Sequence, residues 1–228
     1  MTSPAPELTL PEELLLLALD PLRGKSLCRD RFLEYGVAGA ALRELEFQGR
    51  IAERSGWIRV VDPLAPPDPF LAQVLGSLSA PEAGRPGDGG IDARRWVRQA
   101  GRYAGELCTE HLVRRSVLRR ETHRLLGLLP YQRHPATDPA RSLAIRDRFA
   151  ATCAARFPDQ RGRALAALVS AVDLAAEAGW GGLRDRWAMR DLAHDDWAAH
   201  AVHENVRRDR SSGNRGPLFS SNSSSGDD

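Results

Sequence analysis

The chain has 228 residues, 42% of them hydrophobic and 27% charged, with a formal net charge of +2 at pH 7. This composition is typical of a soluble globular protein, and no apolar run approaches the roughly 20 residues that a membrane-spanning helix requires. Residues 1–10 show no secretory signal, and three widely spaced cysteines form no CxxC pair, which argues against a zinc ribbon and favours a reducing cytoplasm.

The first ninety residues predict helices around a β-hairpin. Residues 1–7 are expected to be a disordered lead, and Thr9-Leu10-Pro11-Glu12 has the spacing of a helix capping box. The apolar run Leu14–Leu19 predicts a helix that is buried on almost every side. The remaining elements expected here are a helix over Asp30–Gln48 that ends at Gly49, strands over Arg50–Glu53 and Trp57–Val61, a loop over Asp62–Pro69, a short helix to Ser79, and a mobile loop over 80–90.

The rest of the chain repeats the pattern of helix followed by hairpin and then continues as helix. A long helix is expected over Ile91–Arg115, followed by strands over Val117–Glu121 and Arg124–Leu129. Residues Arg141–Arg207 read as helical throughout, and 208–228 as a Ser-rich disordered tail. The sequence therefore predicts a mostly α fold, a single compact α-helical domain over 8–207 with two β-hairpins on one face.

Positive charge is concentrated in the middle of the chain. Residues 91–133 carry ten basic and four acidic residues, whereas 1–90 carry nine and thirteen. Arg94, Arg98 and Arg102 are spaced i, i+4, i+8 and would share one face of a helix. Guanidinium groups bind phosphate oxygens in bidentate fashion, so this face is either a solvated helix surface or an anion site.

The second hairpin combines arginines with a strand of leucines. Arg119, Arg120 and Arg124 flank the run Leu125-Leu126-Gly127-Leu128-Leu129. A strand with leucines on both faces is either core on both sides or exposed on one. If it projects, an apolar tip beside arginines fits an anionic membrane surface, where each basic residue contributes about 1 kcal/mol.

No motif in the chain indicates an enzyme, and neither a cofactor nor a bound metal is expected. Gly24-Lys25-Ser26 resembles the end of a phosphate-binding P-loop, but the earlier glycine and the preceding strand are missing. His200 and His203 share a helix face within a C-terminal cluster of His and Asp residues, which is interpreted as a solvated helix end. Asp62 and Asp68 are interpreted as capping residues of the Pro-rich loop.

Several segments together resemble the Golgi phosphoprotein 3 family over roughly residues 8–205. The matching stretches include LTLPEELLLLALD (8–20), AGAALRELEFQGRI (38–51), VDPLAPPDPFLAQVL (61–75), HLVRRSVLRRE (111–121), LGLLPYQRHPATDP (126–139) and ALAALVSAVDLAAE (164–177). The resemblance and the Arg-rich, Ala-rich composition suggest a bacterial member of the family, from an actinobacterium. It implies a mostly helical domain that binds membranes peripherally through phosphatidylinositol 4-phosphate, with an apolar hairpin that enters the bilayer.

Carried over residue by residue, the resemblance implies a head-group site at Arg102, with Arg98 and Arg29 supplying further charge. Gly105 and Ala38 occupy positions at which the eukaryotic members have arginine, and Arg29 occupies that of a tryptophan. The hairpin residues expected to insert are Leu125, Leu126, Leu128 and Leu129.

The resulting functional hypothesis is a non-enzymatic cytoplasmic protein on the inner face of a membrane. Its expected partner is an anionic phospholipid, either a phosphoinositide or a bacterial anionic lipid, and it could also act as an adaptor for an unidentified protein. The alternative is a nucleic-acid-binding protein of the winged-helix type, suggested by the repeated helix–hairpin pattern. Near-neutral overall charge and the apolar residues of the first such helix argue against nucleic acid.

Overall fold

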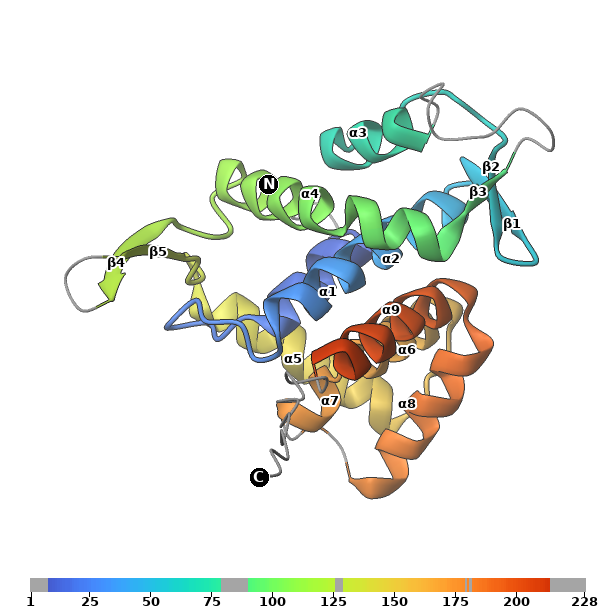
Figure 1. Cartoon of the computed structure of the whole chain (residues 1–228). Coiled ribbons are helices and arrows are strands. Elements are labelled where there is room, and N and C mark those ends of the chain that lie inside the picture. The colour runs from blue at the N-terminus through green and yellow to red at the C-terminus, as the bar shows by residue number, and fades with distance from the viewer. Residues whose placement is uncertain (1–7, 79–89, 126–128, 179, 181, 214–228) are drawn as a thin grey trace, which may run out of the picture.

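A computed structural model describes residues 8–78, 90–125, 129–178, 180 and 182–213. The described part is mostly helical with two small antiparallel sheets, which confirms the predicted fold class (Figure 1). The helices are α1 (Leu10–Ala18), α2 (Asp30–Phe47), α3 (Pro69–Leu78), α4 (Ala93–Arg114), α5 (Pro139–Ala154), α6 (Gln160–Ala171), α7 (Leu174–Glu177), α8 (Leu183–Asp195) and α9 (Trp197–Gly213). The strands are β1 (Ile51–Arg54), β2 (Trp57–Val60), β3 (Ile91–Asp92), β4 (Glu121–Leu125) and β5 (Leu129–Arg133).

Helix α2 lies at the centre of the domain, packed against α1, α4, α6 and α9. Every residue from Tyr35 to Leu42 is buried, and so are the four leucines 14–17 of α1. Removing this apolar surface from water contributes roughly 25 cal/mol per Å² to folding. The prediction that α1 is central is therefore confirmed, and the apolar middle of α2 is part of the same core.

Two glycines allow this central packing. A Cβ atom on Gly36 would lie 2.5 Å from Cγ1 of Val172, and one on Gly39 would lie 2.4 Å from Cγ2 of Val202. Both separations are far below van der Waals contact, so α2 approaches its neighbours more closely than any side chain would permit. Gly49, with φ +69°, adopts the left-handed conformation that was expected just beyond the helix.

The first sheet has three strands in the order β1-β2-β3. The β1–β2 hairpin has the expected position, with Ile51 opposite Val60 and Arg54 opposite Trp57. Ile91 and Asp92 were expected to begin the long helix, but they form β3 against β2 instead. The Asp92 carboxylate accepts a hydrogen bond from Arg95 N at 2.6 Å and so caps α4, which leaves Ile91 free to be extended.

The second hairpin is displaced along the sequence from its predicted place. Strands were expected at Val117–Glu121 and Arg124–Leu129, whereas β4 and β5 pair Glu121 with Arg133 and Leu125 with Leu129. Leu118 is buried in the core and bridges to Ala136, so this segment leads into the hairpin rather than forming its first strand. The connection covers residues 126–128, outside the described residues.

The two sheets lie at opposite ends of α4 rather than on one face (Figure 1). β3 immediately precedes α4, and β4 follows it after a short connection. A helix of 22 residues is about 33 Å long, so it separates whatever its two ends carry. The β4–β5 hairpin stands out from the helical body at one end (Figure 1).

The C-terminal helices confirm the predicted helical region but extend it. Helix α9 continues to Gly213, beyond the expected domain end at 207. Its last turns have tertiary contacts: the Tyr35 hydroxyl donates to Asp209 Oδ2 at 2.9 Å, and Arg210 pairs with Asp173. These contacts stabilise a Ser- and Arg-rich segment whose composition alone indicates disorder. The predicted disorder of 1–7 and 214–228, and the predicted loop over 80–89, fall on residues outside the described part.

Candidate functional site: a charged pocket beside the second hairpin

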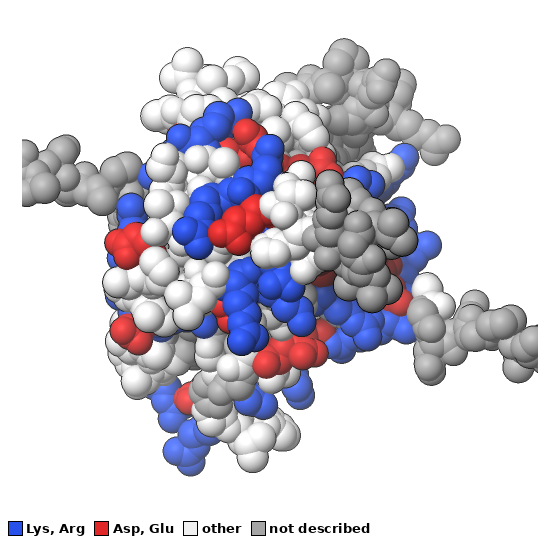
Figure 2. Space-filling view, turned by 90° about the vertical axis from the view of Figure 1, so that its left-hand side faces the viewer, with Lys and Arg blue, Asp and Glu red and all other residues white. Residues whose placement is uncertain are grey.

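A pocket of about 850 Å³ lies between the loop after α1, the start of α2, the second half of α4 and the second hairpin. This volume is within the usual range for sites that bind a small molecule or head group. Its charged lining comprises Lys25, Arg29, Asp30, Glu34, Glu106, Glu110, Arg120, Arg133 and His134. Figure 2 views the molecule from the hairpin side, where Lys and Arg side chains gather in several groups with Asp and Glu between them.

The loop that carries Lys25 is fixed against the chain that follows β5. Gly24 has φ +59°, and a Cβ atom there would lie 2.2 Å from the backbone nitrogen of Pro135. Only glycine fits both the conformation and the space. Ala136 N donates a hydrogen bond to Pro21 O at 3.0 Å. The Arg146 guanidinium donates a second hydrogen bond, to Leu19 O at 2.6 Å. The pocket wall is therefore built from two segments more than 100 residues apart.

Three cations of the lining have no carboxylate partner among the described residues: Lys25, Arg29 and Arg133. The Arg29 guanidinium lies 5.3 Å from the Phe32 ring centroid, and that of Arg133 lies 5.2 Å from the Tyr131 ring. Cation–π contacts of this kind contribute about 0.5–1 kcal/mol at exposed sites and leave the N–H groups available to an anion.

Most carboxylates of the lining are already neutralised. Glu34 accepts a hydrogen bond from Arg31 at 3.0 Å, and Glu106 accepts one from Arg102 at 2.9 Å. Glu110 pairs with Arg120. Asp30, in the first turn of α2, is the acidic group left over. The unpaired cations thus outnumber the unpaired carboxylates, and the pocket can accept a ligand with one or two negative charges.

Two other lining groups restrict the chemistry. Burial, followed by the nearby positive charge of Arg120, lowers the pKa of His134, which favours its neutral form at pH 7. Burial raises the pKa of the Cys28 thiol to about 11, so the thiolate needed for nucleophilic attack is scarce at neutral pH. At neutral pH the pocket therefore contains a largely neutral imidazole and a protonated thiol.

The three predicted head-group residues occupy different places. Arg29 lines the pocket. Arg102 is not part of the described lining; its side chain is 75% exposed and pairs with Glu106, which does line the pocket. Arg98, one turn earlier on α4, is half-buried and also outside the lining. Arg29 and Arg102 are therefore adjacent to the cavity, and Arg98 is more distant.

The two positions at which the eukaryotic members have arginine, Gly105 and Ala38, lie in different environments. Gly105 lines the pocket, where its missing side chain leaves room beside Glu34. Ala38 is fully buried in the core. The α2 residues that face the pocket are instead Asp30, Leu33, Glu34 and Val37. Residue 38, which corresponds in sequence to an arginine of the eukaryotic members, therefore lies in the core and not in the pocket lining.

Two of the predicted membrane-inserting leucines, Leu125 and Leu129, are paired as the last residues in register between β4 and β5. The other two, Leu126 and Leu128, lie outside the described residues.

Sequence reasoning missed the pocket roles of Lys25, Arg133 and His134. Lys25 carried a signal, because Gly24-Lys25-Ser26 attracted attention as a P-loop fragment before its context excluded a nucleotide site. Arg133 and His134 follow the leucine run and carried no comparable signal.

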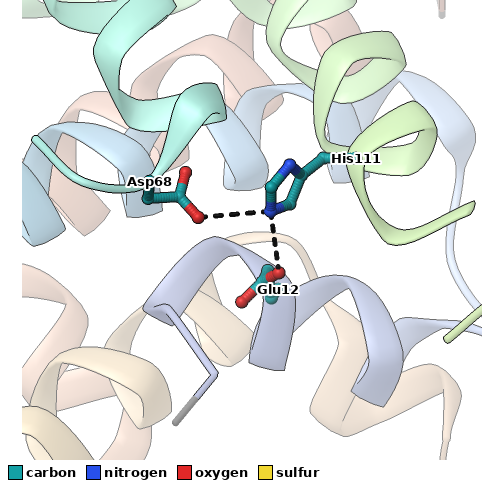
Figure 3. Close-up of side chains that lie close together, drawn as sticks. All are labelled: Glu12, Asp68 and His111. Atoms are coloured by element: carbon teal, nitrogen blue, oxygen red, sulfur yellow. Dashed lines mark ion pairs between the residues drawn. The ribbon is translucent and has the colours of Figure 1, made fainter. Parts of the chain in front are cut away.

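A second polar cluster is buried under α3, where His111 lies between Glu12 and Asp68 (Figure 3). His111 Nε2 is 3.2 Å from Asp68 Oδ2 and 3.6 Å from Glu12 Oε1. The three groups are close enough to share a metal ion. However, Glu12 already pairs with Arg115 and accepts the backbone N–H of Thr9 at 2.8 Å, and the other Asp68 oxygen caps α3 by accepting from Leu71 N. The cluster therefore acts as an ionic link between α1, α3 and α4, and the predicted capping role of Asp68 is confirmed.

The fold and the pocket define a class of protein: a mostly helical domain with a charged cavity beside a projecting hairpin. No helix in the described ranges combines the length and apolar character that crossing a bilayer requires. A family model described as Golgi phosphoprotein 3 (GPP34) matches residues 10–208. The chain belongs to this family, as its motifs indicated. None of the curated proteins compared with the chain matches it.

Proposed function

We propose that this protein is a peripheral membrane protein that binds an anionic lipid head group in the pocket beside the second hairpin. The observation that supports this best is the group of three cations, Lys25, Arg29 and Arg133, which have no carboxylate partner among the described residues and line one cavity. Membership in the Golgi phosphoprotein 3 family supports the same site and suggests phosphatidylinositol 4-phosphate as ligand.

The hairpin supplies the second half of the proposed binding mode. It projects from the helical body (Figure 1), its last residues in register are Leu125 and Leu129, and the sequence between them contains Leu126 and Leu128. Each CH₂ group transferred into the bilayer contributes about 0.8 kcal/mol, and each nearby arginine about 1 kcal/mol on an anionic surface. Insertion of the tip would bring the head group to the pocket mouth.

Arg102 contributes to this site indirectly. Its ion pair neutralises Glu106 at the edge of the pocket. Replacement of Arg102 by glutamate would release Glu106 and add a further negative charge where the phosphate approaches.

Vesicle flotation tests the proposal. Vesicles of neutral lipid are compared with vesicles that also contain phosphatidylinositol 4-phosphate or phosphatidylglycerol, at low and high salt. We expect binding to the anionic vesicles alone, weakened by salt because the attraction is screened. Arg29→Glu and Arg133→Glu should each weaken binding by about tenfold or more.

Arg184→Glu is the matched control, because Arg184 is exposed on α8 away from the pocket and changes the net charge equally. Equal binding to neutral and anionic vesicles, or equal losses in the pocket variants and the control, would contradict the proposal. A double substitution of Leu126 and Leu128 by serine separates the two contributions: it should weaken binding to vesicles and leave binding of a soluble inositol phosphate unchanged.

The nucleic-acid alternative loses its structural support. A winged-helix protein presents the helix before its hairpin to the major groove. Here that helix is α2, whose residues from Tyr35 to Leu42 are all buried. The equivalent helix of the second pattern, α4, is covered by α2, α3 and α9 along its apolar side.

A further inference from the structure

A second, smaller cavity of about 230 Å³ lies among the C-terminal helices. Helix α8 contributes Arg186, Arg190 and His194, and α9 contributes His203 and Arg210. The last turn of α6 contributes Ser170, and the turn between α6 and α7 contributes Asp173. The cavity and the proposed lipid pocket share no described lining residue, and α8, which supplies Arg186, Arg190 and His194, lies away from the β4–β5 hairpin (Figure 1).

The cations of α8 converge by helical spacing. Arg186, Arg190 and His194 are four residues apart, which places them on one face of the helix at successive turns. Like charges in this arrangement repel each other by a few tenths of a kcal/mol per pair. Arg190 has no carboxylate partner among the described residues, and Arg186 donates only to the backbone oxygen of Trp180, at 3.3 Å. A bound anion would relieve this repulsion.

One carboxylate of the lining is already neutralised. Asp173 adopts a left-handed conformation with φ +65°, and its carboxylate pairs with Arg210 of α9. This pair leaves the two arginines of α8 as excess positive charge, with both imidazoles and the Ser170 hydroxyl as further hydrogen-bonding groups.

We propose that this cavity, defined by Arg186, Arg190, His194 and His203, binds a soluble phosphate group, either inorganic phosphate or a small phosphate monoester. Its volume is below the range of sites that hold drug-sized ligands, which fits a single phosphoryl group with a small substituent. The planar guanidinium groups suit two phosphate oxygens each. The described lining includes no residue of the hairpin or of the lipid pocket, which favours a soluble phosphate over a lipid of the docked membrane.

His203 makes the site sensitive to pH. Its ring lies 5.9 Å from that of His194. Burial, and then the neighbouring His194, lower the pKa of His203. Its surroundings are His194, Arg186 and Arg190 of α8, His200, Glu204, Arg207 and Arg210 of α9, and Asp173 of the α6–α7 turn. An anion favours the protonated imidazole, so bound phosphate should raise the pKa of His203.

Calorimetric titration of the full chain with inorganic phosphate tests the proposal, at constant ionic strength and at pH 6 and pH 8. Site-specific evidence comes from the NMR signals of the histidine rings, because phosphate in this cavity should shift the His203 titration to higher pH. We expect Arg190→Ala to weaken phosphate binding by about tenfold or more and to abolish the shift.

Arg184→Ala is the matched control. Arg184 is two residues from Arg186, on the opposite side of the same helix, and is exposed. The Arg184→Ala variant should bind phosphate as tightly as the unaltered protein does. The proposal is overturned if phosphate leaves the His203 titration unchanged, or if Arg190→Ala and Arg184→Ala behave alike.

A further experiment compares two sources of the phosphate group. Glycerol 3-phosphate is the soluble source, and vesicles that contain phosphatidic acid are the lipid source. Binding of the soluble ester that requires Arg190 supports the site. Binding through Arg190 to the vesicles alone, with no binding of inorganic phosphate or glycerol 3-phosphate, overturns the assignment to a soluble ligand.

Discussion

Glu12 connects three elements through a single buried carboxylate. One oxygen accepts the Thr9 backbone N–H at the start of α1, and the other pairs with Arg115 beyond α4. His111 approaches the same oxygen and also faces Asp68 (Figure 3). Because the Glu12 side chain is fully buried, its charge is tolerated only while these partners surround it.

We expect Glu12→Gln to lower the free energy of unfolding by about 2–4 kcal/mol. The neutral amide keeps the shape of the side chain, but it leaves Arg115 without its carboxylate and His111 with one carboxylate instead of two. Urea denaturation measures the change. Glu106→Gln is the control, because its pair with Arg102 is 66–75% exposed and contributes little. Equal stability of the two variants would contradict the structural role of Glu12.

At the scale of elements, the approach of α2 to its neighbours depends on missing side chains. Alanine at a helical glycine normally stabilises by about 1 kcal/mol through helix propensity. At Gly39 the added Cβ would meet Val202 Cγ2 at 2.4 Å, and overpacking of a core costs typically 1–3 kcal/mol. The steric cost exceeds the gain in propensity.

We therefore expect Gly39→Ala to destabilise the protein by about 1–2 kcal/mol. Gly76 provides the matched comparison, because it lies in α3 and nothing is within 4 Å of a Cβ built there. Gly76→Ala should stabilise by up to about 1 kcal/mol. Thermal unfolding of both variants, monitored by circular dichroism, measures the two opposite shifts, and shifts of the same sign would contradict the proposed packing.

At the scale of the whole molecule, buried titratable groups limit the pH range of stability on both sides. Burial lowers the pKa values of His134 and His203 below the ordinary 6.5. The unfolded chain then binds protons that the folded chain does not, so the free energy of unfolding falls as pH decreases through about 6.5.

Buried cysteines lower the stability of the fold at alkaline pH. Burial raises the pKa values of Cys28 and Cys153 from 9.0 to about 11. Between these values the unfolded chain loses protons that the folded chain retains, and the free energy of unfolding falls as pH rises above about 9.

We thus expect maximal stability between about pH 7 and pH 9. Urea denaturation from pH 5.5 to pH 10.5 measures the profile. The double substitution of His134 and His203 by asparagine should flatten its acid side. Cys28→Ala with Cys153→Ala should reduce the loss on its alkaline side, to which Cys108 also contributes because burial raises its pKa as well. A profile that these substitutions leave unchanged would assign the pH dependence to other groups.

Local patterns in the sequence were sufficient for most helices and for the family. The buried α1 and the turn at Gly49 each follow from residues within a few positions of one another. Side-chain periodicity and glycine conformation are local properties of the chain, so the sequence determines them without knowledge of the neighbours.

Which residues line the pocket depends on the tertiary structure. Lys25 and Arg133 line one cavity because Gly24 permits the backbone to touch Pro135. β3 exists because β2 satisfies its backbone groups, and the turn of α9 that carries Asp209 is held by Tyr35. Such features depend on partners far away in sequence. Local propensity therefore predicted a helix start for β3 and disorder for the end of α9, and it could not show which cations meet.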